Sequence, residues 1–445
     1  MIEKILIANR GEIAVRIIRA CKEMGIETVA VYSQADAQAL HTLLADEAIC
    51  IGPAPSVDSY LNMERILSAT ITMGADAIHP GFGFLSENSK FARMCEECGA
   101  KFIGPGPAVI DCMGNKAAAR NTMIEAGVPV VPGSKEPILE VAKGKIEADK
   151  VGYPVMIKAA SGGGGRGMRI AECEAEFESQ FMTAQREAEK GFSDPTMYIE
   201  RYVKEPRHIE FQILADAHGN AIHMGERDCS IQRRHQKMIE EAPSPAISKE
   251  LRAKMGEAAV RAAKATKYEN AGTIEFLLDK DKNFYFIEMN TRIQVEHPVT
   301  EAVTGIDLIK EQIRIANGER LRFSQEDITI NGHAMECRIN AEDPDNNFMP
   351  CPGTVSDSHF PGGFGVRIDS AIYSGYKIPP NYDSMIAKVI VHGENREEAI
   401  RKMRAALSEF SIEGVTTNQE YQLKILGHPV FKDGEQDTSF IEQFM

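Results

Sequence analysis

The stretch AGTIEFLLDKDKNFYFIEMN contains two carboxylates in an arrangement that predicts a metal site. It has the pattern of two apolar strands joined by a turn in DKDKN, centred between Asp281 and Lys282, and this register places Glu275 directly opposite Glu288. Like charges that face each other across a ladder destabilise it, and buried carboxylates need a counter-charge. A hard cation such as Mg²⁺ meets both needs, because it binds one or two carboxylates together with substrate phosphates. The alternative is a solvent-facing acidic pair on an edge hairpin, and the apolar flanking residues favour the metal.

The segment TRIQVEH follows directly and carries residues suited to binding and deprotonating a small oxyanion. If the segment is extended, Arg292, Gln294 and Glu296 project to one side. The planar fork of Arg292 suits a carboxylate-like anion such as bicarbonate. Glu296 could take a proton from a bound acid, so the segment predicts an acid–base site beside the metal.

A basic run lies upstream, in ERDCSIQRRHQKMIEE, and contains Arg233, Arg234, His235 and Lys237. On the surface these residues would contribute little to stability. On an inward-facing wall they would neutralise phosphate and carbonate charge. Periodicity does not decide between the two arrangements.

A glycine-rich stretch, SGGGGRGMRI at residues 161–170, stands between two strand-like segments, YPVMIKAA and GMRIAEC. This order predicts a hairpin rather than a P-loop, which needs a helix and a Lys-Ser/Thr ending. The alternative to a functional loop is a flexible hairpin tip. Lys158, in the preceding strand, favours a phosphate site built from this cation and exposed backbone N–H groups. Such a hairpin on a hinge would act as a lid that excludes water.

The elements that must position these residues indicate a multidomain chain of the α/β and α+β classes. Residues 2–8, the helical pattern GEIAVRIIRACKEMG and the strand IETVAVYS form a βαβ opening without a G-x-G-x-x-G fingerprint, so no nicotinamide cofactor is indicated. This first, doubly wound unit ends near Gly114. A helical pattern, NKAAARNTMIEAG, comes next and is followed by a linker or hinge, GVPVVPGSKEP. The strand YDSMIAKVIVHG with an amphipathic helix belongs to the last domain.

Composition excludes several classes of protein. The 50 basic and 65 acidic residues give a net charge of −15, which argues against a nucleic-acid or anionic-membrane binder. No apolar run approaches the roughly 20 residues of a membrane span, and the N-terminus lacks the pattern of a signal peptide. Nine scattered cysteines, with one CxxC pair at Cys95 and Cys98, favour reduced thiols over a disulfide framework or zinc site. We therefore expect a cytoplasmic protein.

Several motifs in combination carry a resemblance to a known family. They are ANRGEIAVRIIRA, HPGFGFLSEN, MGNK, KAASGGGGRGM, ERDCSIQRRHQK, FIEMNTRIQVEHPVTE, ECRINAEDP and PPNYDSMIAK. Together they resemble biotin carboxylase, an ATP-grasp enzyme, over essentially the whole chain. The resemblance implies a Rossmann-like N-terminal domain at residues 1–114 and an ATP-grasp domain at 115–330. It further implies a mobile glycine-rich lid at about 131–203 and a C-terminal α+β biotin carboxylase domain at 331–445.

The resemblance also implies the roles of individual residues. The residues expected to bind ATP are Lys116, Lys158, Gly164, Gly165, Glu200, Arg201, Tyr202, Val203, His208, Gln232, His235, Glu275, Leu277 and Glu288. The expected ligands of two Mg²⁺ ions, for which Mn²⁺ could substitute, are Glu275, Glu288 and Asn290. The expected bicarbonate site comprises Lys237, Arg292, Gln294, Val295 and Glu296. Arg338 and Phe82 are expected to bind biotin, and the expected catalytic set is Arg292, Glu296, Lys237 and Arg338.

One position departs from the common bacterial form of the family. HPGFGF has Phe82 where a tyrosine is common, which removes one hydroxyl near the implied biotin pocket. We expect the ring packing and the activity to survive this loss of a hydrogen bond.

The chemistry implied by the resemblance is carboxylation of the N1′ nitrogen of biotin. Glu296 would deprotonate bicarbonate, which attacks the γ-phosphate of MgATP to give carboxyphosphate and ADP, while the metal ions and lysines offset the phosphoryl charge. Carboxyphosphate would decompose to CO₂ and phosphate, and the phosphate would remove the N1′ proton. Arg338 would stabilise the anionic ureido oxygen, and lid closure would keep water from the intermediate.

The chain contains no A-M-K-M-like biotin attachment motif, so we expect it to act on a separate biotin carboxyl carrier protein together with carboxyltransferase subunits. The expected setting is the acetyl-CoA carboxylase that makes malonyl-CoA for fatty-acid synthesis, with a homodimer as the form common in the family. One alternative is a subunit of a split pyruvate or propionyl-CoA carboxylase, and another is a different ATP-grasp ligase. A nucleotide-sensing module without turnover is disfavoured, because Glu275, Glu288, Glu296 and Lys237 are all present.

Overall fold

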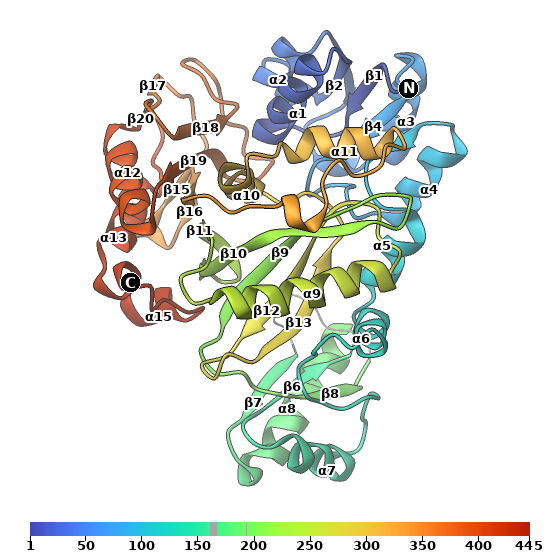
Figure 1. Cartoon of the computed structure of the whole chain (residues 1–445), viewed down its shortest axis with the longest axis vertical. Helices are drawn as coiled ribbons and strands as arrows, with labels where there is room; N and C mark the ends of the chain where they lie inside the picture. The colour runs from blue at the N-terminus through green and yellow to red at the C-terminus, as the bar shows by residue number, and fades with distance from the viewer. Residues whose placement is uncertain (161–166, 193) are drawn as a thin grey trace. The chain divides into compact units, whose positions relative to one another are not determined.

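The computed structural model describes residues 1–160, 167–192 and 194–445, and its chain path is drawn in Figure 1. These residues divide into two compact units. Unit 1 comprises Met1–Val128, Arg207–Phe276 and Glu288–Met445, whereas unit 2 comprises Pro129–Pro206 and Leu277–Ile287. Gly164 and Gly165 of the predicted phosphate loop lie outside the described residues.

The N-terminal part of unit 1 is a five-stranded parallel sheet in the order β3-β2-β1-β4-β5. Its strands are β1 (Lys4–Ile7), β2 (Glu27–Ser33), β3 (Glu47–Gly52), β4 (Ala77–His79) and β5 (Lys101–Phe102). The main helices of this part are α1 (Gly11–Glu23), α3 (Met63–Thr72) and α4 (Ser89–Glu97). Parallel strands with helical connections have apolar residues on both faces, as the buried run from Ile5 to Ala8 shows. The prediction of a doubly wound α/β unit is confirmed.

Helix α1 illustrates how the sequence builds this layer. Ile13 and Ile17, one turn apart, are fully buried and join the core that contains Ile5 and Ile7. The helix ends before Gly25, whose φ of 71° is the left-handed conformation that glycine adopts without a Cβ penalty.

A second sheet of eight strands runs through the rest of the chain in the order β13-β12-β9-β10-β11-β14-β19-β18. Its strands are β9 (Arg207–Ala215), β10 (Ala221–Arg233), β11 (Gln236–Ala242), β12 (Asn270–Leu278), β13 (Phe284–Asn290), β14 (His333–Asn340), β18 (Val366–Ser370) and β19 (Met385–Gly393). From β9 to β18 in this order, neighbouring strands pair antiparallel. Helix α9 (Lys249–Ala265) packs on β9 and β10, α12 (Arg396–Glu409) packs on β14 and β19, and α10 (His297–Thr304) contacts β10, β11, β14 and β19.

Unit 2 contains a three-stranded sheet in the order β7-β6-β8, with two helices packed on it. Its elements are β6 (Val155–Ala159), β7 (Met168–Ala171), β8 (Met197–Arg201), α7 (Val141–Val151) and α8 (Glu174–Phe192). Phe177 and Phe181, one turn apart on α8, are fully buried with Ile157 and Ile199. Strands β6 and β7 pair antiparallel, which confirms the predicted hairpin around the glycine-rich stretch.

The remaining elements complete the description. They are α2 (Leu40–Leu44), α5 (Pro107–Gly114), α6 (Lys116–Glu125), α11 (Leu308–Ala316), α13 (Gln419–Gly427), α14 (Pro429–Lys432), α15 (Phe440–Phe444), β15 (Glu342–Asp343), β16 (Met349–Pro350), β17 (Asp357–His359) and β20 (Ser411–Glu413). Among the described residues, no helix combines the length and apolar character needed to cross a membrane.

The centre of the turn between β12 and β13 lies half a residue earlier in the chain than predicted. The N–H of Asp279 donates to the carbonyl of Asn283 at 2.9 Å, and the N–H of Lys282 donates to the carbonyl of Asp279 at 3.1 Å. These bonds centre the turn on Asp281, with Lys282 at a φ of 65°. The prediction erred because it assumed a turn of even length, whereas a residue in the left-handed conformation closes a three-residue turn.

Candidate active site

Lys237, on β11, lies between three carboxylates that come from three different elements. Its Nζ donates to Glu210 of β9, to Oε1 of Glu275 of β12 at 3.0 Å and to Oε1 of Glu296 at 2.6 Å. Burial would lower the pKa of Lys237, but the three negative charges outweigh it and hold the pKa well above its usual value. The lysine therefore carries a fixed positive charge at the junction of β9, β11 and β12.

Arg227, on β10, forms a second cation in this cluster and is fully buried. It donates to Glu210, Gln212, Thr273, Gln294 and Thr300. Neither Arg227 nor Glu210 was predicted from the sequence. A signal was available for Glu210, because Glu210 and Gln212 alternate with apolar residues in HIEFQILA and so point to a buried polar face. Arg227 stands among three consecutive charged residues in MGERD, where no alternation marks it.

Glu275 is the most heavily hydrogen-bonded of the predicted metal ligands. Its Oε1 accepts from Asn290 Nδ2 and from Gln294 Nε2, both at 2.8 Å, and its Oε2 lies 2.9 Å from His208 Nε2. Burial opposes ionisation of Glu275, but Lys237 and His208 hold its pKa well below the usual range. Glu275 is therefore a carboxylate at neutral pH.

Glu288, the second predicted metal ligand, is exposed and accepts no hydrogen bond within the described part of the chain. The surrounding protein and then the negative charge of Glu275 raise its pKa, while Lys116 lowers it. The two glutamates are thus close enough to interact electrostatically. An available carboxylate beside a second carboxylate and the amide oxygen of Asn290 is a set of hard oxygen donors, which fits Mg²⁺.

Arg292 lies between Asn290 and a residue that the sequence did not point to, Glu87. Its Nε donates to Glu87 Oε2 at 2.9 Å, and one terminal nitrogen donates to Asn290 Oδ1 at 3.0 Å. Glu87 also accepts from the N–H of Thr291 at 3.0 Å. The side chain of Arg292 is 21% exposed, so it retains an accessible edge for a small anion.

The condition that TRIQVEH is extended is not met over its whole length, because residues 295 and 296 form a turn and Glu296 is the N-cap residue of helix α10. The helix starts here with Pro298 in its first turn, where a proline costs no hydrogen bond. Gln294 and Glu296 still both reach the Lys237 cluster. The turn, rather than strand alternation, brings them together.

Glu296 is held between two cations from different strands. Its Oε1 accepts from Lys237, and its Oε2 accepts from Arg338 on β14 at 2.9 Å. Burial disfavours the charged form, but Lys237, Arg338 and Arg227 together hold the pKa of Glu296 well below its usual range. The carboxylate is ionised at neutral pH and is therefore in the form that accepts a proton.

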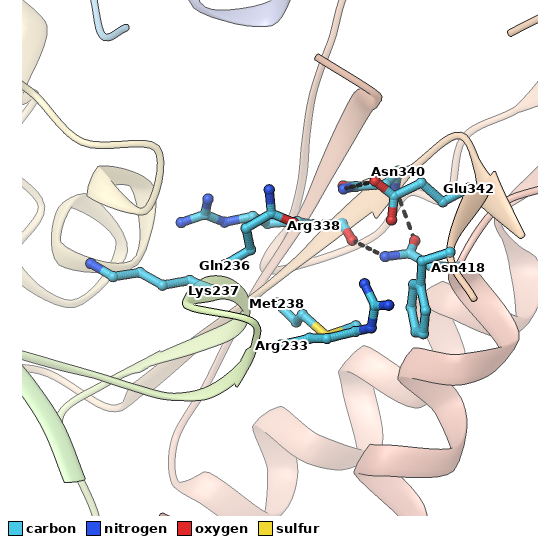
Figure 2. Close-up of a pocket in the computed structure, with 9 residues that line it drawn as sticks. Arg233, Gln236, Lys237, Met238, Arg338, Asn340, Glu342 and Asn418 are labelled. Carbon is cyan, nitrogen blue, oxygen red and sulfur yellow. Dashed lines mark hydrogen bonds between the residues drawn. The ribbon is translucent and has the colours of Figure 1, made fainter. Parts of the chain in front are cut away.

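A pocket opens beside these residues (Figure 2) and is lined by Arg233, Gln236, Lys237, Met238, Arg338, Asn340, Glu342, Phe348 and Asn418. Figure 2 shows Lys237 and Arg338 extending in the same direction, away from Asn340 and Asn418. Arg233 instead bonds Asn347 Oδ1 at 2.9 Å and lies over the ring of Phe348.

The basic run is thus divided between the two arrangements that periodicity left open. Lys237 faces the cluster of carboxylates, whereas Arg234 and His235 are exposed at the tip of the β10–β11 hairpin. Gln232 is half-buried and pairs with Lys237 across the ladder.

The remaining predicted residues lie as follows. Lys116 is exposed at the start of α6, and Phe82 is half-buried against the N-terminal core. Within unit 2, Lys158 forms an ion pair with Glu200. Val203 packs with Leu277 in a small apolar cluster of unit 2, whereas Arg201 ends strand β8 and Tyr202 directly follows it.

Matches to protein families cover the chain in three parts. Residues 1–110 match the biotin carboxylase N-terminal domain, residues 115–324 the carbamoyl-phosphate synthase L chain ATP-binding domain, and residues 336–443 the biotin carboxylase C-terminal domain. The chain belongs to the biotin carboxylase family. Membership confirms the predicted fold class and the predicted enzyme class, an ATP-grasp ligase that carboxylates biotin.

Curated relatives align with this chain over its full length. It is 58% identical to biotin carboxylase 1 of Bacillus subtilis, with 100% of this chain and 99% of the relative covered. It is 55% identical to a pyruvate carboxylase subunit of Methanothermobacter thermautotrophicus, over 100% of this chain and 90% of the relative.

Among solved structures, the biotin carboxylase domain dimer of Hydrogenobacter thermophilus 2-oxoglutarate carboxylase is similar, with a TM-score of 0.91 and 52% identity. The comparison covers 100% of this chain and 98% of that one. That structure is a complex with MgADP, ADP and bicarbonate, which agrees with the predicted use of ATP and Mg²⁺.

Proposed function

We propose that this chain carboxylates biotin on a separate carrier protein, through carboxyphosphate, as the first half-reaction of an acetyl-CoA carboxylase. The observation that carries the proposal is the position of Glu296, an ionised carboxylate between Lys237 and Arg338. The Glu296 side chain contacts both Lys237, which belongs to the predicted bicarbonate site, and Arg338, which is predicted to bind biotin.

In the proposed first step, Glu296 takes the proton of bicarbonate, while Arg292 and Lys237 hold the anion. Support comes from the separate anchoring of both cations, because Glu87 orients Arg292 and Glu210 orients Lys237. Preorganised charges stabilise a developing anion without further reorganisation. Gln294 and the backbone of Val295 would complete the wall around bicarbonate.

Phosphoryl transfer requires positive charge near the γ-phosphate of ATP, because negative charge develops there during the reaction. Glu275, Glu288 and Asn290 would hold Mg²⁺, which supplies that positive charge when bound. The ATP contacts from Lys116, Lys158, Gly164, Gly165, Glu200, Arg201, Tyr202, Val203, His208, Gln232, His235 and Leu277 remain part of this proposal. The domain division at residues 114 and 330, with a lid at about 131–203, belongs to it as well.

In the second step, Arg338 would stabilise the anionic ureido oxygen of biotin, while Phe82 packs against the ring system. Arg338 is suited to this role because it lines the pocket and is anchored at Nε by Glu240. An anchored guanidinium still presents further N–H groups to a ligand.

Acetyl-CoA is the carboxyl acceptor that we propose, and one other acceptor has support of its own. Acetyl-CoA, with malonyl-CoA as the product for fatty-acid synthesis, is the first candidate, and its partners would be a biotin carboxyl carrier protein and carboxyltransferase subunits. Pyruvate is the second candidate, because a pyruvate carboxylase subunit is 55% identical over this whole chain. We also propose a homodimer in the cytoplasm, in line with the dimer of the Hydrogenobacter relative.

The test is an assay of ATP hydrolysis with bicarbonate and Mg²⁺, with and without free biotin. The proposal predicts stimulation by biotin and loss of that stimulation in Glu296→Ala. Hydrolysis that biotin does not affect would contradict it. Capture of the biotinylated partner, followed by carboxyl transfer to acetyl-CoA or to pyruvate, then distinguishes the two acceptors.

A further inference from the structure

Behind Arg338 lies a pair of buried carboxyl groups, Glu240 on β11 and Glu336 on β14, and neither contacts a reactant in the reaction proposed above. Both side chains are fully buried. Oε1 of Glu240 accepts a hydrogen bond from Nε of Arg338 at 2.6 Å. We infer that Glu240 is a positioning residue, which holds the Arg338 guanidinium in place while Glu296, the other partner of Arg338, gains and loses a proton. This inference rests on the proposed role of Arg338 toward biotin.

The geometry assigns separate edges of the guanidinium to the two glutamates. Nε binds Glu240, and a terminal nitrogen binds Glu296 at 2.9 Å. Protonation of Glu296 would weaken the second bond, because a hydrogen bond to a charged acceptor is the stronger kind. The first bond keeps its charged acceptor, because the negative charge of Glu296 raises the pKa of Glu240 and loss of that charge favours ionised Glu240. Arg338 therefore keeps its orientation at the moment when the ureido oxygen becomes anionic.

Glu336 explains how Glu240 can carry a charge in this interior. The two residues are direct partners across the β11–β14 ladder. Among the described residues, neither oxygen of Glu336 nor Oε2 of Glu240 has a hydrogen-bond partner. Burial raises the pKa of Glu336 well above its usual value, although Lys388 on β19 opposes the shift, and the raised pKa favours the neutral acid. A neutral Glu336 lets Glu240 ionise without a second charged carboxylate beside it.

The charged groups around Glu240 set the pH at which it acts. Burial, together with the negative charge of Glu296, raises the pKa of Glu240 to about 7, whereas Arg338 and Lys237 oppose the shift. Glu336, the ladder partner of Glu240, is the remaining titratable group that faces it. The anchoring form is the ionised one, so positioning is complete above this pH and weakens as the pH falls through it. The biotin-dependent reaction then has an acid limb that originates at Glu240.

The test compares Glu240→Gln with the unchanged chain in biotin-dependent ATP hydrolysis between pH 6 and pH 9. We expect kcat with free biotin to fall about tenfold or more at high pH, because a small misplacement of a catalytic group is costly, while KM for bicarbonate changes less than about twofold. The acid limb near pH 7 disappears in the variant. An unchanged kcat, or a fall in kcat with the acid limb retained, would overturn the inference.

Three further variants separate positioning from general structure. Glu241→Gln is the matched control, because Glu241 is the next residue of β11 and pairs with Arg396 and His333 instead. It should change stability and leave the pH profile as it was. Glu336→Gln imitates a neutral acid and should retain kcat within about twofold. Arg338→Gln tests the proposed function itself: retained biotin stimulation would refute that function, whereas loss in Arg338→Gln with a normal Glu240→Gln would refute only the positioning role.

Discussion

The ammonium group of Lys388, on β19, donates a hydrogen bond to the backbone carbonyl of Val295 at 2.8 Å. Lys388 is fully buried and is held by Glu12, from α1, at 3.1 Å and by Asp369, from β18, at 3.8 Å. A cation from the C-terminal sheet therefore fixes the turn that places Glu296, with a carboxylate of the N-terminal part as its counter-charge.

Removal of the Lys388 cation should lower the free energy of unfolding of the chain. Lys388→Met leaves Glu12 buried without its partner, while Asp369 keeps its ion pair with Arg367, and breaking a buried pair in this way costs about 3–5 kcal/mol. Urea titration of the variant measures the loss. Lys22→Met is the control, because the Lys22–Asp46 pair is exposed and such pairs contribute about 0–1 kcal/mol. Equal midpoints for the two variants would contradict the structural role of Lys388.

Glu296→Ala should abolish carboxylation and leave nucleotide binding intact. A general base contributes typically about 10²–10⁴-fold to rate, so biotin-dependent turnover should fall by at least about 100-fold. Nucleotide affinity, measured by calorimetry, should change little. Near-normal turnover in the variant would refute the role of Glu296 as the base.

Glu275→Gln should raise the Mg²⁺ concentration needed for ATP hydrolysis. The substitution removes one of two neighbouring carboxylates but retains a side chain that can still contact Asn290 and Gln294. Titration of activity with Mg²⁺ and then with Mn²⁺ measures the shift, and chelation of metal should stop hydrolysis in both proteins. If Glu275→Gln and the unchanged chain needed the same Mg²⁺ concentration, Glu275 would not be a metal ligand.

Acid stability should depend on Glu241. Its pKa is about 2, because burial is outweighed by Arg396 and His333, compared with an ordinary value of 4.5. A depressed pKa stabilises the fold above the unfolded-state value and loses that contribution, on the order of 3 kcal/mol, as the pH falls from about 5 toward 2. Glu241→Gln should be less stable at neutral pH and lose less stability over that range. If the free energy of unfolding fell equally with pH in Glu241→Gln and in the unchanged chain, Glu241 would not be the source of the acid sensitivity.

Phe82→Tyr should restore a hydroxyl near the proposed biotin pocket. One hydrogen bond contributes about 0.5–1.5 kcal/mol, so KM for free biotin should fall by about two- to tenfold with little change in kcat. Steady-state kinetics with varied biotin measures this. A rise in KM would show that the half-buried ring has no room for the hydroxyl.

The amino-acid sequence by itself determined the strands, the main helices and the identity of most candidate site residues. Alternation of apolar residues places Glu275 on a buried strand, and the βαβ opening follows from the same local periodicities. These features depend on neighbouring residues only, so a linear pattern contains them. The motifs around Arg292, Glu296 and Arg338 likewise carried the family resemblance.

The tertiary structure alone decided which charges meet. Lys237 contacts Glu210, 27 positions away, and Arg338 contacts Glu296, 42 positions away, and no local period encodes either distance. The half-residue shift of the β12–β13 turn and the bend that replaces an extended TRIQVEH were also outside the reach of alternation. The physical reason is that a buried charge is stable only with partners, and those partners become known only when distant strands are placed side by side.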